Sequence, residues 1–295
     1  MADERTTWRA KALGEAKEVQ LRSGTLRYHD TGTGRPLVFA HGLLVNANLW
    51  RKPVERLAPD FRCVTLDLPL GSSVLSMPDA DLTPTGAADL ITEAVEAIGL
   101  DDVTLVGNDT GGALAQIAIT RRPERIGRLV LTSCDAFDNF PPRIFQLALA
   151  PAQIPALSRI LFAPLRLRPL RRLPFAFGWL AKHGIDQQAE DSYVLPPLRN
   201  PANGDDAARF IRGVDTRYTQ DAAERLLKLE QPALIAWSSD DKVFPAEHAE
   251  RLAELIPGAR LEWIEDSYTY SPEDNPERLA ELIAGFVREP LEATA

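Results

Sequence analysis

Short apolar runs alternate with amphipathic segments along most of the chain. The apolar runs have the length of buried strands, and the segments between them place apolar residues at helical spacing. The predicted strands cover residues 36–40, 63–68, 103–107, 128–133, 232–239 and 260–265, and the predicted helices cover 83–100, a segment from about Gly112, one near 246–256 and one from about 275 to 288. This alternation predicts an α/β protein: a mostly parallel sheet with helices on both faces.

The first residues follow a different pattern. Residues 1–17 are charged and have no apolar core, which predicts a solvated tail or a short helix and argues against a signal peptide. Two short strands, 18–23 and 25–30, are predicted around Ser23 and Gly24.

The alternation stops between about residues 137 and 215, where the composition also changes. From Pro141 to Ile185 there is no Asp or Glu, and basic residues stand among Leu, Phe, Ile and Pro: Arg143, Arg159, Arg166, Arg168, Arg171, Arg172 and Lys182. Such an apolar, proline-broken insert predicts a helical cap that shapes an apolar pocket. We therefore expect an α/β core of residues 18–136 and 216–290, a cap of residues 137–215 and a tail of residues 1–17.

The basic residues of the cap allow three interpretations. They attract an anionic group, they pair with acidic core helices on a solvated face, or they lie at a membrane surface together with the apolar residues. We favour the solvated face for any single arginine and the membrane surface least.

Composition and charge exclude several classes of protein. The chain has 295 residues, of which 45% are apolar, enough for one large α/β domain with an inserted subdomain. A net charge of -9 disfavours a nucleic-acid partner. No window reaches the roughly 18 apolar residues of a membrane span, so we expect no stable membrane insertion. Cys63 and Cys134 lie in or beside apolar runs, which predicts buried free thiols in a cytoplasmic protein.

Polar residues follow several predicted strands, at the carboxyl ends where α/β sheets bind ligands. The stretch Val106–Gly112 reads VGNDTGG and places Asp109 between two glycines at a sharp bend. Other strands are followed by His41 and Gly42, by Asp135, and by Asp240 and Asp241.

The motif Gly107-Asn-Asp-Thr-Gly111, between a strand and a helix, resembles the nucleophile elbow of the α/β-hydrolase superfamily. The resemblance covers roughly residues 20–135 and 216–288, and the insert lies where this superfamily places its cap. His41-Gly42 resembles its oxyanion loop. The segment from Trp237 to Pro245 resembles the strand end that carries the triad acid, and its spacing selects Asp241 with Asp240 as neighbour.

An aspartate at the elbow is similar to the epoxide hydrolase and haloalkane dehalogenase branch of that superfamily. A carboxylate is ionised at neutral pH and attacks carbon without a base; water activated by a histidine then hydrolyses the ester. The resemblance implies that Asp109 is the nucleophile and that the N–H groups of Leu43 and Thr110 form the oxyanion hole. The alternative is that Asp109 only caps the following helix, a role that does not require the flanking glycines.

The family's histidine is missing. Thr269 stands in its place, and a threonine hydroxyl is not a base near pH 7. The four histidines are His29, His41, His183 and His248; we expect His41 to be structural, and His183, on the cap, is the least implausible substitute. The Trp after the nucleophile and the Asn after His-Gly of a dehalogenase are also absent, as is the proline of an epoxide hydrolase. Tyr193 and Tyr218, near the end of the insert, are expected to be packing residues.

Three functions stay open. The first, to which we commit, is a hydrolase for a small, largely apolar substrate that uses Asp109, while Asp241, Asp240, Asp135 or a cap histidine activates water, since crowded carboxylates raise a pKa. The second is an isomerase, lyase or cyclase with Asp109 as general acid or base, and the third is an inactive small-molecule binding protein.

The remaining site residues follow from the same strand ends. We expect His41, Gly42, Asn108, Asp135, Asp240 and Thr269 to line the site. No phosphate loop and no metal-ligand spacing occurs, so the sequence predicts no cofactor and no metal. A small-molecule substrate is the expected partner, and the oligomeric state stays open.

Overall fold

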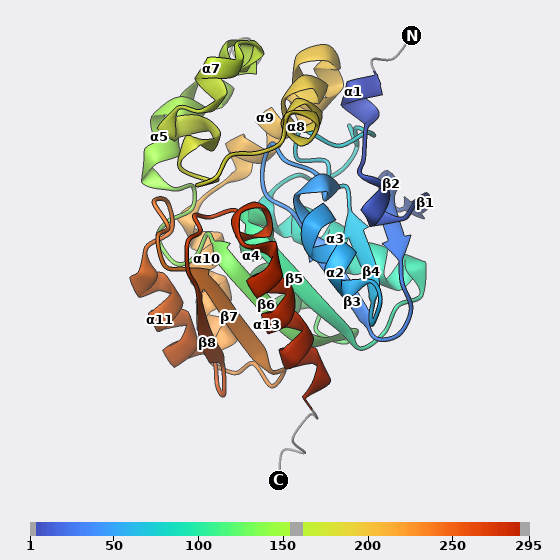
Figure 1. The fold of residues 1–295 in the computed structure, drawn as a ribbon, viewed down its shortest axis with the longest axis vertical. Helices are drawn as coiled ribbons and strands as arrows, with labels where there is room; N and C mark the ends of the chain where they lie inside the picture. Colours follow the sequence, from blue (N-terminus) through green and yellow to red (C-terminus); the bar gives the residue numbers. More distant parts are fainter. Residues whose placement is uncertain (1–3, 154–161, 290–295) are drawn as a thin grey trace.

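The computed structural model describes residues 4–153 and 162–289 and contains one eight-stranded sheet (Figure 1). The strand order is β1-β2-β4-β3-β5-β6-β7-β8. Strand β2 runs antiparallel to both neighbours, and the pairs from β4 to β8 are parallel. The expected α/β fold class, with a mostly parallel sheet, is confirmed. The strands are β1 Glu15–Leu21, β2 Gly24–Thr31, β3 Pro36–Ala40, β4 Arg62–Leu66, β5 Val103–Asp109, β6 Ile126–Cys134, β7 Ala233–Ser238 and β8 Arg260–Ile264.

Two rows of helices cover the sheet. Helices α2 and α13 contact each other in one row, and α3, α4, α10 and α11 form the other (Figure 1). Every residue of β5 is buried, because a central parallel strand is covered on both faces. The core helices are α2 Arg51–Leu57, α3 Pro84–Ile98, α4 Thr110–Arg121, α10 Thr216–Leu226, α11 Ala246–Leu255, α12 Ser271–Asp274 and α13 Pro276–Arg288.

Signals at helix ends and in apolar runs agree with the structure. The Thr83 side chain accepts a hydrogen bond from the Gly86 N–H at the start of α3, and Gly99 ends that helix with a φ of 75°. Cys63 and Cys134 are buried free thiols, as expected. Within residues 4–153 and 162–289, no helix is both long and apolar enough to cross a membrane.

The first residues are more ordered than the expected tail. Helix α1 covers Glu4–Thr7, a 3-10 turn η1 covers Lys11–Leu13, and β1 begins at Glu15, three residues before the predicted strand. Leu13 is fully buried, so this segment packs on the core instead of extending into solvent.

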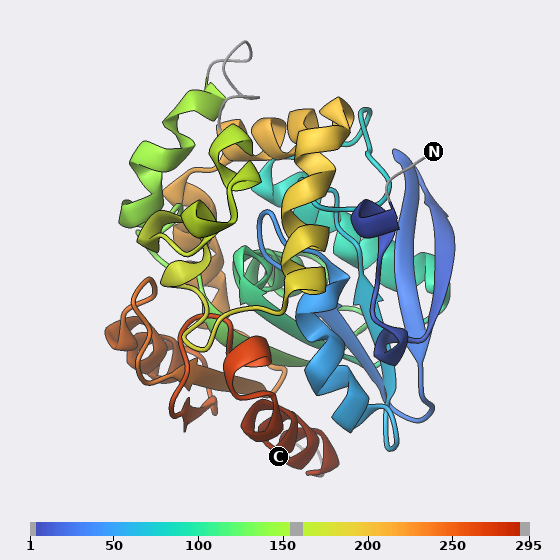
Figure 2. The same ribbon diagram turned by 45° about the horizontal axis from the view of Figure 1, so that its top comes forward.

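We call residues 137–215 the cap; its described residues, 137–153 and 162–215, form a layer of helices above the sheet (Figure 2). Its first half has short elements broken by proline, and its second half has two longer helices in contact, α8 and α9. The elements are α5 Arg143–Leu149, η3 Ala150–Gln153, η5 Ala163–Arg166, α7 Arg168–Arg171, the π turn η6 Pro174–Gly178, α8 Gln187–Arg199 and α9 Pro201–Gly213. Arg159 lies outside the described residues.

Two of the cap arginines, Arg168 and Arg171, pair within the cap. Arg171 is buried and forms ion pairs with Glu190 at 2.9 Å and Asp191 at 2.7 Å, both on α8, and Arg168 reaches Asp191 at 3.1 Å. The expected pairing with acidic core helices is therefore wrong for these two arginines, because α8 supplies the carboxylates.

Candidate active site

Asp109 lies at a sharp turn between β5 and α4. Its φ of 55° and ψ of −132° are strained for a residue with a side chain, at a cost of about 1–3 kcal/mol. The turn is so tight that a Cβ on Gly107 would collide with the Gly111 carbonyl oxygen, and one on Gly111 would collide with the Ala40 carbonyl. The Asp109 side chain accepts no N-cap hydrogen bond from the second or third residue of α4, which argues against a role as a helix cap alone.

The Asp109 carboxylate is buried against the backbone of the loop after β3. A Cβ on Gly42 would overlap its Oδ2. Burial raises the pKa of Asp109 to about 7; the Thr110 N–H, which donates to the carboxylate, opposes this rise, and the charge of Asp241 adds to it. Asp109 therefore exists in both protonation forms near neutral pH.

Tyr270 is a site residue that the sequence analysis missed. Its hydroxyl lies 3.5 Å from Asp109 Oδ2, and the ring is buried in the wall of the cavity. Burial, followed by the charge of Asp109, raises the pKa of Tyr270 well above its ordinary value, so the phenol keeps its proton. The only sequence signal was its position next to Thr269.

A cavity of about 600 Å³ opens in front of Asp109, beneath the cap. The cap lines it with apolar side chains, among them Phe140, Phe145, Leu147, Phe162, Phe175 and Phe210. Its polar lining is small: Asp109, Thr110, Asp135, Gln146 and Tyr270. An apolar space with a few polar groups at one end suits a small apolar ligand with one reactive group.

Leu43 and Thr110, the predicted oxyanion hole, both line this cavity. The Leu43 N–H has no acceptor among the described residues, whereas the next N–H, of Leu44, donates to the Leu70 carbonyl at 3.0 Å. Thr110 directs its N–H at the Asp109 carboxylate. The free N–H of Leu43 and that of Thr110 are thus available for a developing oxyanion.

Asp135 shares the cavity with Asp109. It is fully buried, its Oδ2 accepts a hydrogen bond from the Thr110 hydroxyl at 3.2 Å, and its Oδ1 has no partner among the described residues. Burial and then the charge of Asp109 raise its pKa well above the ordinary value. Two such carboxyl groups in one apolar site favour the retention of a proton between them.

Thr269 and Asp241 form a pair behind the cavity wall. The Thr269 hydroxyl donates to Asp241 Oδ1 at 2.9 Å, and the N–H groups of Val243 and Phe244 donate to the same oxygen at 2.8 and 2.9 Å. Burial raises the pKa of Asp241 to about 6. Neither residue lines the cavity.

Asn108 connects this pair to the elbow. Its Nδ2 donates to the Thr269 carbonyl oxygen and to the Thr132 hydroxyl, both at 2.8 Å. Asn108 thus holds neighbouring strand ends together and does not face the ligand space.

The histidines do not contribute to the cavity wall. Nε2 of His41 accepts the Leu68 N–H at 2.9 Å, so Nδ1 carries the proton and donates to the Gly42 carbonyl at 2.8 Å. Burial lowers the pKa of His41 to about 4, which keeps it neutral. The side chain of His183 is 50% exposed and bonds to Asp266 at 3.0 Å. All four histidines lie in the described part of the chain, and none lines the cavity, so His183 as a substitute base is wrong.

Asp240, Tyr193 and Tyr218 also lie outside the cavity. The Asp240 side chain is 42% exposed and pairs with Lys182 of the cap, so its predicted place in the site is wrong. Tyr193 is buried with its hydroxyl 3.3 Å from Glu273, which fits the expected packing role. Tyr218 packs beneath the Arg217 guanidinium.

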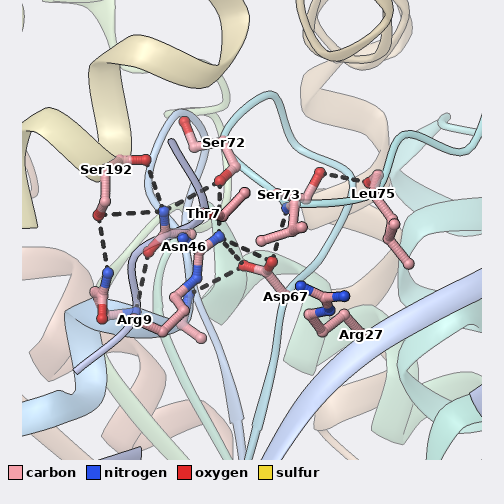
Figure 3. A network of polar contacts seen from close by, with 12 residues as sticks. Thr7, Arg9, Arg27, Asn46, Asp67, Ser72, Ser73, Leu75 and Ser192 are labelled. Carbon is pink, nitrogen blue, oxygen red and sulfur yellow. Dashed lines mark hydrogen bonds and ion pairs between the residues drawn. The ribbon is translucent and has the colours of Figure 1, made fainter. Parts of the chain in front are cut away.

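A buried polar network holds the loops around the site (Figure 3). Arg9 binds both carboxylate oxygens of Asp67 at 2.9 Å, and Asn46 donates to the carbonyls of Ser72 and Ser192. Burial alone would raise the pKa of Asp67, but the charge of Arg9 and further favourable contacts, among them the Val74 N–H, together outweigh it, and the pKa lies below its ordinary value. The network joins the first residues, the loops after β3 and β4, and cap helix α8.

Comparisons with known proteins agree with this fold. A family model described as the alpha/beta hydrolase fold matches residues 35–276. An uncharacterized hydrolase of Bacillus subtilis is 27% identical, with 88% of this chain and 93% of the relative covered. A cis-3-alkyl-4-alkyloxetan-2-one decarboxylase of Shewanella oneidensis is 26% identical, with 90% and 85% covered. A solved structure described as an ancestral haloalkane dehalogenase superposes with a TM-score of 0.77 at 20% identity, with 92% and 98% covered, and shows the shared fold.

Proposed function

This chain belongs to the alpha/beta hydrolase fold family, and from that premise we propose that it hydrolyses a small, largely apolar electrophile through an ester on Asp109. The position of Asp109 carries the proposal: a strained carboxylate, free of capping bonds, is held at the polar end of an apolar cavity. Backbone strain persists only where the surrounding structure enforces it, and here the strained turn directs the Asp109 carboxylate at the ligand space.

In the first step, an Asp109 oxygen bonds to an sp3 carbon of the substrate. The bond from that carbon to a halide or epoxide oxygen breaks, and its electron pair leaves with that atom. An epoxide oxygen needs a proton, and Asp135 holds one in the same cavity because burial and Asp109 raise its pKa. An epoxide therefore uses Asp135 as general acid, whereas a halide leaves unaided.

In the second step, Asp135 replaces the missing histidine. Once Asp109 is an ester it has no charge, so one of the causes that raise the pKa of Asp135 disappears. After an epoxide, Asp135 is already ionised because it has given its proton to the epoxide oxygen; after a halide, it first releases its proton to water in the cavity. Ionised Asp135 then takes a proton from water, and the oxygen of that water adds to the ester carbonyl. The N–H groups of Leu43 and Thr110 stabilise the oxyanion, and Asp135 returns the proton to the departing alkoxide.

Asp241 has a supporting role in this proposal. Three donors occupy its Oδ1, and together with Thr269 it stands behind the cavity wall. Its charge helps to keep the pKa of Asp109 near 7. Among the candidate bases, Asp135 is the one that shares the cavity with the nucleophile.

A second candidate function is a lyase in which Asp109 is a general acid or base. The absence of any histidine from the cavity lining favours it, because a reaction without ester hydrolysis needs no such base. The Shewanella relative is named a decarboxylase of a dialkyl oxetanone, and loss of carbon dioxide consumes no water.

The test is intact-protein mass spectrometry after incubation with terminal epoxides, alkyl halides and a dialkyl oxetanone. We expect an adduct of substrate mass on the wild type and none on Asp109→Asn, with turnover reduced on the order of 10⁴-fold in the variant. An alkene from the oxetanone without any adduct would favour the lyase. Equal turnover by folded Asp109→Asn protein would contradict both functions.

A further inference from the structure

The first half of the cap exposes apolar side chains that proteins normally bury. Among the described residues, the exposed large apolar side chains are Leu147, Leu167, Phe175, Trp179 and Leu227. All but Leu227 lie between Pro141 and Ile185, although that segment is a small part of the chain. Apolar side chains gathered in this way mark an interaction surface.

These side chains belong to neighbouring elements. The π turn η6, which carries Phe175, contacts α5, which carries Leu147, and also α7 (Figure 1). Leu167 directly precedes α7, and Trp179 directly follows η6. We call Leu147, Leu167, Phe175 and Trp179, with the arginines described next, the cap face.

Basic residues stand between these apolar ones. Arg166, Arg168 and Arg172 are exposed, and the side chains of Arg166 and Arg172 form no hydrogen bond or ion pair with any described residue. A hollow of about 370 Å³ beside them is lined by five arginines and one carboxylate, that of Asp191. This concentration of positive charge occurs in a chain whose net charge is -9.

We propose that the cap face docks on the surface of a lipid bilayer that contains anionic lipids. The arginines contact the lipid phosphates, and the four apolar side chains enter the boundary between headgroups and acyl chains. A bilayer fits better than an acidic protein because the free cations alternate with Leu, Phe and Trp over short elements, the composition of an interfacial segment.

The cavity reaches the same face. Leu147 and Phe175 are exposed and also line the cavity in front of Asp109. A lipophilic substrate dissolved in the bilayer would therefore pass into the cavity without crossing water. This route for the substrate rests on the proposed function, whereas docking itself does not require any chemistry at Asp109.

Vesicle flotation tests the docking without any reaction. The full chain is mixed with vesicles of phosphatidylcholine alone or of phosphatidylcholine with phosphatidylglycerol. We expect binding to the mixed vesicles, weaker binding to the neutral ones, and a loss of binding at high salt. Leu147→Ser with Phe175→Ser, and separately Arg166→Gln with Arg172→Gln, should each weaken binding on the order of tenfold.

Matched controls change the same chemistry elsewhere. Leu227→Ser removes an exposed leucine on the core, and Arg22→Gln with Arg225→Gln removes two exposed cations; both should leave binding unchanged. Circular dichroism checks that each variant is folded. Fluorescence of Trp179 should shift to the blue on mixed vesicles, and Trp179→Phe should abolish that shift.

Two outcomes would overturn the proposal. One is no flotation with either vesicle, including the case in which the protein binds inorganic phosphate alone. The other is flotation that the cap-face variants and the control variants weaken equally. In either case an adduct on Asp109 would still form, so failure of docking and failure of the proposed chemistry are distinguishable.

Discussion

The floor and the roof of the cavity differ in almost every physical property. The floor consists of strand ends that bring together the buried carboxyl groups of Asp109, Asp135 and Asp241, whose pKa values burial raises. The roof consists of short, proline-broken elements with apolar side chains and, from Pro141 to Ile185, no carboxylate at all. The difference teaches that reactivity and access reside in separate parts of the chain, so each can be changed alone.

A polar network around the buried pair of Arg51 and Glu273 joins the two regions. Arg51 of α2 binds Glu273 of α12, with a second contact at 2.9 Å, and also binds Asp186, which begins α8 of the cap. Tyr193, on the same cap helix, reaches Glu273 as well. The roof is thus fixed to the floor through charged groups.

The largest effect is expected when a residue of the floor is substituted and the roof is left unchanged. Asp135→Asn should slow hydrolysis of the Asp109 ester about 10²- to 10⁴-fold, because it removes the base of the second step. With an alkyl halide the adduct should still form and then persist, and with an epoxide it should not form, since the acid is also lost. The lifetime of the adduct by mass spectrometry measures this. The exposed Asp240→Asn is the control, and a short-lived adduct in folded Asp135→Asn would contradict the role of Asp135.

Separation of roof from floor should appear as a loss of stability. Glu273→Gln removes the buried carboxylate that binds Arg51 and leaves that buried guanidinium only the half-exposed Asp186 as a charged partner, which costs about 3–5 kcal/mol in the free energy of unfolding. Urea denaturation measures that loss. Glu277→Gln, which disturbs the exposed pair with Arg56, should cost less than about 1 kcal/mol. Equal losses in the two variants would show that the buried pair does not fix the cap.

The pH dependence of the first step reports on the ionisation of Asp109 in the floor. Attack requires ionised Asp109, and its pKa is raised to about 7, so the rate of adduct formation with an alkyl halide should rise roughly tenfold per pH unit below that value and level off above it. Single-turnover rates between pH 5 and pH 9 measure the profile. A rate that is already constant from pH 5 upward would mean that Asp109 has an ordinary pKa.

The smallest effect is expected where the cavity opens through the cap. Leu147 is 88% exposed and lines the cavity, so Leu147→Ser should raise KM for a reactive apolar substrate about threefold and leave kcat unchanged. Steady-state kinetics with a substrate found in the adduct experiment measure the two constants. A fall in kcat at constant KM would place Leu147 in the chemical step.

The sequence predicted the central elements well because their burial is complete. Strand β5 is buried along its whole length, and its apolar residues therefore appear as one continuous run. Strand β1 begins with exposed and half-buried residues, so its start at Glu15 left no apolar signal. The short 3-10 and π turns of the cap are too brief to show any periodicity.

The site was predictable only where local backbone geometry constrains the sequence. The tight turn requires Gly107 and Gly111, and these glycines revealed Asp109. Tyr270 has no motif, since tertiary packing alone brings its hydroxyl to the nucleophile. Spacing separated Asp241 from Asp240, but it could not show that Asp240 turns outward to a lysine of the cap.

The pairing of Arg9 with Asp67 has a practical consequence for work on this protein. Because the first residues are charged and have no apolar core, they resemble a tail that could be removed. Removing them would be a natural first step in crystallisation. A chain that starts after Arg9 would keep the Asp67 carboxylate, which has no exposed surface, without its cation. The loop after β3, which presents Gly42 and Leu43, would also lose the hydrogen bond that Asn48 Nδ2 donates to the Trp8 carbonyl at 3.0 Å. A trimmed enzyme that is inactive would then report a damaged oxyanion loop rather than a missing nucleophile.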